Sequence, residues 1–158
     1  MNQDVLSTPG HLIGLAARGL ARLSEARLKP LGFGVGHVPV LVALRDGRAS
    51  TQRDLARFAR IEQPPMAQML ARMERDGLIR REHDPADRRS SQVTLTELAE
   101  ARLPDAVATL LQGNQEVLRN FTEAEVGLLV TLLTRLIAGL DEVARVGSPR
   151  APVFRTGT

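Results

Sequence analysis

Residues 51–95 read TQRDLARFARIEQPPMAQMLARMERDGLIRREHDPADRRSSQVTL, and the pattern of this stretch decides the fold. Thr51 stands before a short helical pattern with Asp54 three residues on, which is a variant of the capping box. Residues 63–77 form a second helical pattern, and its two early prolines are tolerated because the first turn needs no amide donors. Glycine commonly ends a helix, and Gly77 stands at the end of this pattern. The stretch therefore predicts two helices joined by a short turn.

The residues after Gly77 change from a helical to an alternating pattern. Residues 78–82 are predicted to form a strand, and residues 90–95 a return strand in which apolar residues alternate. The turn between them carries two adjacent arginines, Arg88 and Arg89. The sequence thus predicts a β-hairpin with a positively charged tip.

Most of the remaining chain is predicted to be helical. Apolar residues recur with a helical period over residues 11–29, and residues 37–45 form a short apolar helix. Thr96 caps a long helix to about residue 120, and a capping box at residues 122–125 begins the last helix. The fold class is therefore mainly α with a small β-hairpin wing.

The last helix carries more apolar residues over 126–140 than a single buried stripe requires. This density favours burial on more than one side, as in a dimer. The alternative is an ordinary helix in the core of one chain.

Composition excludes several classes of protein. The chain has 158 residues, 43% of them hydrophobic and 25% charged, which is typical of a folded globular protein of one domain or slightly more. It has no cysteine, so disulfides, thiolate zinc sites and cysteine nucleophiles are excluded. It contains no apolar run near 18 residues and no secretory signal at its start, so no membrane is expected and the cytoplasm is the expected location.

Charge is distributed unevenly along the chain. Residues 45–92 carry a net charge of +3, whereas residues 93–144 carry −5. Nearly all basic residues are arginine, a residue type that binds DNA phosphates and groove edges well. The base composition of the genome is an alternative explanation for this abundance. A localised positive face in the middle segment is therefore possible, and a uniformly basic surface is not.

Sequence motifs for catalysis or metal binding are lacking. The glycines at 32, 34 and 36 follow a helix rather than a strand and lack the context of a phosphate-binding loop. The three histidines have no metal-ligand spacing, and no nucleophile elbow occurs. We therefore expect neither an enzyme nor a cofactor.

Two helices followed at once by a hairpin form a winged helix-turn-helix pattern. An α-helix fits the major groove of B-DNA, and arginines at a hairpin tip can enter the adjacent minor groove. This order of elements predicts contact with double-stranded DNA.

The sequence resembles the SlyA-like branch of the MarR family of transcriptional regulators over roughly residues 10–143. The matching segments are residues 27–31, 61–81 and 84–100. The last segment is the most specific, because it carries the wing signature of the family in Asp87, Arg89, Val93, Leu95 and Thr96. The sequence departs from the family at Pro65, where a small hydroxyl residue is usual, and at Gln68, where close relatives place arginine.

The resemblance implies a role for each residue at the wing tip. Arg89 would enter the minor groove, Asp87 would hold its guanidinium, and Arg88 would contact the backbone or the same groove. The alternative is a solvated, charged turn.

The resemblance also implies contacts in the major groove. The positions that meet the bases in this family are occupied here by Gln63, Pro64, Pro65 and Gln68, and glutamine can pair with adenine through two hydrogen bonds. Thr51 and Gln52 could reach phosphates near a helix N-terminus. The alternative is a polar helix face, with the methionines of this helix in the core.

The resemblance implies a ligand pocket as well, because small aromatic acids bind many family members and lower their affinity for DNA. Arg18 matches a carboxylate-binding arginine of SlyA-like relatives, and His37 and His11 lie near the same pocket. An ion pair for Arg18 and a capping role for His37 are the alternatives. Val42 and Met69 replace polar pocket residues, which favours a less polar ligand.

The resemblance thus implies a homodimeric, ligand-responsive repressor with a pseudopalindromic operator. Its expected parts are a dimerisation helix (8–32), a winged helix-turn-helix domain (33–95), dimerisation helices (96–146) and a flexible tail (147–158). The alternative is a winged-helix protein-interaction module that does not bind specific DNA.

Overall fold

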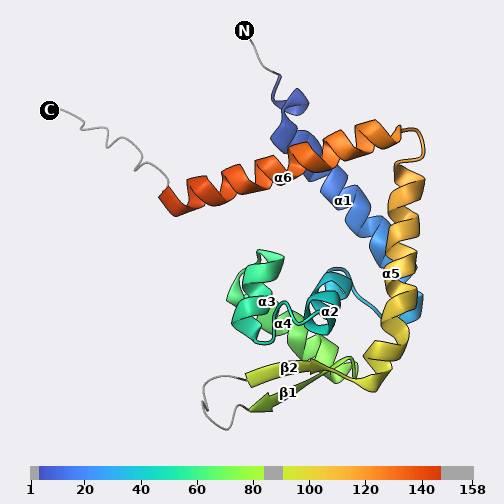
Figure 1. Ribbon diagram of the computed structural model, residues 1–158, viewed down its shortest axis with the longest axis vertical. Helices are drawn as coiled ribbons and strands as arrows, with labels where there is room; N and C mark the ends of the chain where they lie inside the picture. The colour runs from blue at the N-terminus through green and yellow to red at the C-terminus, as the bar shows by residue number, and fades with distance from the viewer. Residues whose placement is uncertain (1–3, 84–90, 147–158) are drawn as a thin grey trace, which may run out of the picture. The chain divides into compact units, whose positions relative to one another are not determined.

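The computed structural model describes residues 4–83 and 91–146 of the chain. Figure 1 shows the arrangement of its helices and the two-stranded hairpin. The α-helices are α1 (Pro9–Leu28), α2 (His37–Arg45), α3 (Gln52–Ala59), α4 (Gln63–Arg75), α5 (Glu97–Val117) and α6 (Glu123–Val146). Short 3₁₀ turns occupy Val5–Ser7 and Lys29–Leu31, and the strands are β1 (Ile79–His83) and β2 (Ser91–Leu95).

The chain divides into two compact units, and the boundary falls within α5. The first unit ends at Asn114 and contains α1 to α4, the hairpin and most of α5. The second begins at Gln115 and contains the end of α5 and all of α6.

The hydrophobic core of the first unit is assembled around the helix-turn-helix. Helices α2, α3 and α4 contribute most of it, and β1, β2 and the first half of α5 complete it. Its largest fully buried side chains include Leu28, Leu41, Leu55, Met66, Leu70, Met73, Leu78, Ile79 and Leu103. Because α3 and α4 bury one face each in a common core, their other faces are left on the surface.

The hairpin is antiparallel and is joined to the segment before α3. Ile79 pairs with Leu95, Arg81 with Val93, and the register continues to His83 with Ser91. The amide of Val93 donates to the carbonyl of Ser50 over 2.7 Å, and Thr51 forms an isolated bridge with Gln92. The segment before α3 therefore contacts β2 through Ser50 and Thr51.

Thr96 connects the hairpin to α5. Its hydroxyl donates to the carbonyl of Gly77 over 2.6 Å and accepts from the amide of Ala99 over 3.2 Å. One threonine therefore caps α5 and holds the end of β2 next to the end of α4.

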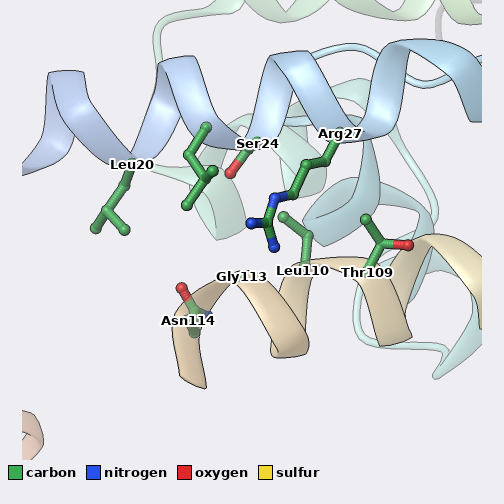
Figure 2. Close-up of a pocket in the computed structure, with 8 residues that line it drawn as sticks. Leu20, Ser24, Arg27, Thr109, Leu110, Gly113 and Asn114 are labelled. Carbon is green, nitrogen blue, oxygen red and sulfur yellow. The ribbon is translucent and has the colours of Figure 1, made fainter. Parts of the chain in front are cut away.

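Helices α1 and α5 lie side by side at a narrow pocket between Leu20 and Asn114 (Figure 2). The side chain of Arg27 extends from α1 toward Gly113 on α5, which is buried. A Cβ atom built on Gly113 would lie 3.5 Å from Nη1 of Arg27 and 3.7 Å from Cδ2 of Leu23. These are ordinary van der Waals distances, so the helices leave room for one methyl group.

We expect Gly113→Ala to stabilise the protein and Gly113→Leu to destabilise it. Glycine in a helix interior costs about 0.5–1 kcal/mol relative to alanine, and the alanine methyl fits. Leucine would displace both Arg27 and Leu23. For a chain of this size the gain corresponds to a melting temperature raised by about 2–4 °C, measured by circular dichroism at one protein concentration. A lower melting temperature for the alanine variant would contradict the packing described here.

Helix α6 begins with the predicted capping box. The amide of Glu125 donates to the hydroxyl of Thr122, and the amide of Thr122 donates to the carboxylate of Glu125 over 2.8 Å. The hydrogen bond from the backbone of Thr122 lowers the pKa of Glu125, because it stabilises the ionised form. Many large apolar side chains of α6 are exposed in the single chain, among them Leu128, Val130, Leu132, Leu136, Leu140 and Val143.

The predicted elements agree with the structure except at their ends and at one core residue. The first helix begins two residues earlier than predicted, and α5 ends at Val117 rather than near residue 120. Helical periodicity predicts Leu55, Phe58 and Ala59 on the inner face of α3, but Phe58 is 40% exposed, whereas Ala56 is buried. The prediction for Phe58 was wrong because the buried stripe of α3 passes through Leu55 and Ala56.

Candidate nucleic-acid interface

The first half of α4 presents its polar residues to solvent. Met66, Leu70 and Met73 are fully buried, which confirms that they belong to the core. The four residues predicted to meet the major groove are all exposed at the start of the helix: Gln63, Pro64, Pro65 and Gln68. The apolar and exposed residues thus lie on opposite faces of one helix, as a recognition helix requires.

The turn between α3 and α4 fixes how the two helices meet. Arg60, which ends α3, adopts a left-handed conformation with a φ of 55°. The amide of Ile61 then donates to the carbonyl of Ala56 over 3.1 Å. These contacts close α3 and direct the chain into α4.

Gln52 and Gln63 connect the starts of these two helices. Nε2 of Gln52 donates to Oε1 of Gln63 over 3.0 Å. Gln52 is the first residue of α3 and Gln63 the first residue of α4. The two predicted contact residues therefore act together, which the sequence analysis did not anticipate.

Thr51 has a structural role before any contact with DNA. Its hydroxyl donates to the carboxylate of Asp54 over 2.7 Å and accepts from the amide of Asp54 over 3.2 Å. The hydroxyl hydrogen is thus engaged by the cap of α3, which leaves lone-pair capacity on the oxygen but no donor for a phosphate. Arg53 and Arg57 on the same helix are exposed cations that sequence analysis did not single out.

Arg81 joins β1 to the recognition helix. Its Nη2 donates to the carbonyl of Ala67 over 3.4 Å, and its Nε lies 3.4 Å from Oε2 of Glu74. Nε is buried and, among the described residues, has no hydrogen-bond partner of good geometry. Burying an arginine in this way costs free energy, so its contacts across two turns of α4 indicate that it holds the wing against the helix. An arginine in a charged strand carries no sequence signal for this role.

The wing tip itself lies outside the described residues. Asp87, Arg88 and Arg89 fall within residues 84–90, so their predicted roles stay predictions. The strands that lead to the tip are in place on either side.

Comparison with known proteins identifies the family of this arrangement. The model of the MarR family matches residues 36–91, which contain α2, α3, α4 and β1 and end at the first residue of β2. A mutant of MarR from E. coli, solved in complex with operator DNA, is 25% identical with a TM-score of 0.76, and the match covers 85% of this chain and 99% of that one. The MarR family model thus matches the helix-turn-helix of this chain, and the fold is similar to that of MarR.

Two further members of the MarR family extend the comparison. The transcriptional regulator SlyA is 25% identical with a TM-score of 0.77, over 89% of this chain and 96% of that one. BpsR from Bordetella bronchiseptica, whose DNA binding is regulated by 6-hydroxynicotinic acid, is 26% identical with a TM-score of 0.78. That match covers 86% of this chain and 97% of BpsR. The winged helix-turn-helix predicted from sequence is thus confirmed as the DNA-binding fold of a MarR-family regulator.

The three predicted ligand residues of this chain are not gathered at one cavity. His37 lines a surface cavity of about 520 Å³ whose other charged lining residues are Glu25, Lys29, Arg72 and Asp76. Arg18 and His11 are not among its lining residues. Arg18 lies on α1 with its Nη1 close to Gly14, and His11 occupies the first turn of that helix. Lys29 and Arg72 were not predicted, because only the fold brings the end of α1 next to α4.

His37 is 7% exposed and is held by a backbone amide. Its Nδ1 accepts from the amide of Gly34 over 3.0 Å, which places the proton of the neutral ring on Nε2. Burial lowers the pKa of His37, and the charge of Arg72 lowers it further against the opposing effect of Asp76. The ring is therefore neutral in the folded protein at neutral pH, and the capping alternative is consistent with its contact to Gly34.

The lowered pKa of His37 predicts that stability falls on mild acidification. The unfolded chain takes up a proton near pH 6.5 while the folded chain still resists it, so stability is complete above that pH and decreases below it. We expect the melting temperature of the wild type to decrease from pH 7 to pH 5.5. His37→Asn, which keeps an acceptor for the amide of Gly34, should flatten that decrease. An equal decrease in both proteins would contradict this role.

Two further properties are limited to the part of the chain that the structure describes. No helix within residues 4–83 and 91–146 is both long and apolar enough to cross a membrane. Within the same residues, no cluster of three or more acidic or histidine side chains could hold a metal ion.

Proposed function

We propose that this chain is a homodimeric, sequence-specific DNA-binding repressor, with no catalytic step, that acts in the cytoplasm. The observation that carries the proposal is the start of α4, where four side chains are exposed to solvent: Gln63, Pro64, Pro65 and Gln68. In this proposal α4 enters the major groove, and glutamine side chains read base edges there. The operator complex of the E. coli MarR mutant supports it.

The wing supplies the second contact of the proposed complex. Arg89 enters the minor groove, Asp87 orients it, and Arg88 contacts the backbone or the same groove. A narrow minor groove concentrates negative potential and attracts arginine. Thr51 and Gln52 lie at the start of α3, where backbone amides and the side chain of Gln52 can reach phosphates.

Dimerisation gives the proposed regulator its operator symmetry. The N-terminal helix, α5 and α6 form the dimer body, in line with the apolar side chains that α6 exposes in the single chain. A two-fold dimer reads two half-sites about 34–36 Å apart, so we expect a pseudopalindromic operator.

A small aromatic carboxylate, or a related anion, releases the DNA in this proposal. Arg18 on α1 is one cation for the carboxylate, with His11 on the same helix. The cavity at His37 offers two others, Lys29 and Arg72. BpsR, whose DNA binding responds to 6-hydroxynicotinic acid, supports an aromatic acid as the ligand class. Titration of salicylate into the DNA complex tests this part, and no change in DNA affinity or melting temperature would count against it.

The direct test is fluorescence anisotropy with the DNA upstream of the protein's own gene. A random duplex of equal length serves as the control, and both are titrated over a salt series. We expect affinity for the specific DNA about 10³-fold or more above that for random DNA. Binding to both should weaken steeply with salt, because phosphate contacts release counterions. No binding to either duplex at low salt would favour the protein-interaction module instead.

A further inference from the structure

Two glutamines occupy equivalent places in the helix-turn-helix. Gln52 opens α3, Gln63 opens α4, and their side chains share one hydrogen bond with Gln52 as the donor. Gln63 is exposed, and Gln52 is half-buried at the base of α3. A bond between two exposed side chains adds little to stability, so its value lies in what it does to the orientation of Gln63.

The bond leaves Gln63 with a defined set of free hydrogen-bonding groups. An amide oxygen has two lone pairs, and an amide nitrogen carries two hydrogens. Oε1 of Gln63 uses one lone pair on Gln52. The second lone pair of Oε1 and both hydrogens of Nε2 stay available for a base.

This set of groups matches the major-groove edge of adenine. Adenine presents an acceptor at N7 and a donor at the N6 amino group, and a glutamine amide pairs with both. The terminal torsion of a free glutamine has two broad, nearly equivalent orientations that exchange the donor and the acceptor. Gln52 donates to Oε1 of Gln63 in the structure, and this bond favours one of the two orientations before DNA binds.

We propose that Gln52 is a positioning residue that fixes the amide of Gln63 in the orientation that reads adenine in the major groove. This inference rests on the proposed function and adds the base that Gln63 selects and the residue that enforces the selection. Gln52 acts through Gln63 and not through a base of its own. The pair therefore behaves as one reading unit built from both helices.

The test measures base preference rather than affinity alone. Each base pair of one operator half-site is replaced in turn, and binding is measured by anisotropy for the wild type, Gln52→Ala, Gln63→Ala and the double variant. We expect the wild type to prefer adenine by about tenfold or more at one position, as one bidentate pair provides. Gln63→Ala should lose this preference, Gln52→Ala should lose most of it, and the double variant should resemble Gln63→Ala.

Two matched variants sharpen the result. Gln52→Glu offers only acceptors, so it should draw Nε2 of Gln63 toward itself and reduce the adenine preference at least as much as Gln52→Ala. Gln112→Ala removes an exposed glutamine on α5 and should keep both affinity and preference. In the free protein, Gln52→Ala should shift the side-chain amide resonances of Gln63 in a ¹⁵N spectrum, a readout that needs no DNA.

The outcomes separate this inference from the proposed function. If Gln52→Ala weakens binding equally for all four bases, Gln52 is only a phosphate contact and the inference is overturned. A Gln63-dependent preference for another base, or unshifted amide resonances, would also overturn it while leaving a DNA-binding regulator in place. A wild type with no sequence preference would overturn the proposed function and this inference with it.

Discussion

Arg89→Ala is expected to weaken operator binding by more than about tenfold without loss of helicity. The predicted wing arginine gives up its contact with the minor groove, where negative potential is strongest. Arg89 falls between the two strands in the sequence, and the described core that supports α4 is built from other residues. The loss should therefore appear in DNA binding and not in folding.

Anisotropy at moderate salt, with circular dichroism alongside, measures this effect. The control is Arg119→Ala, which removes the same charge at an exposed position after α5. Arg89→Ala should reduce the slope of affinity against salt more than Arg119→Ala does, because it removes a contact to DNA and not only net charge. Unchanged operator affinity of Arg89→Ala would show that the tip is a solvated turn.

The double substitution Leu132→Glu with Leu136→Glu is expected to convert the proposed dimer to monomers. The two leucines lie one turn apart on α6, and they are 49% and 41% exposed in the single chain. Two carboxylates on an apolar interface would have to be buried without partners, which is unfavourable. Because a monomer engages only one half-site, operator affinity should fall by about a hundredfold or more.

Analytical ultracentrifugation and anisotropy together measure this second effect. Val35→Glu is the matched control, since it inserts the same charge at an exposed apolar position outside the proposed dimerisation helices. Circular dichroism should show that the double variant keeps the helices of the winged domain, whose core does not include α6. A stable dimer in the double variant would mean that α6 is not the dimer interface.

Much of the helix-turn-helix was predictable because its signals are local. The cap at Thr51, the prolines that open α4, the glycine at its end and the methionines at helical spacing each depend on residues within a few positions of one another. The capping box at Thr122 and Glu125 forms as predicted, for the same reason. Family resemblance added the roles of residues at the wing tip and at the start of α4, which no pattern of periodicity contains.

Phe58 shows the limit of reasoning from periodicity. On this eight-residue helix, Phe58 and Ala56 both lie within one turn of Leu55. Periodicity alone does not decide which of them faces the core. The packing of α3 against its neighbours buries Ala56 and leaves the ring of Phe58 40% exposed.

The sequence by itself determined which segments form the helices and the hairpin, because capping and periodicity act over a few residues. Only the tertiary structure decided which distant side chains meet. The bond between Gln52 and Gln63, the contacts of Arg81 with α4 and the charged cavity at His37 each join residues from different elements. Such contacts depend on the angles at which the elements pack, and those angles follow from the shape of the shared core rather than from any local pattern.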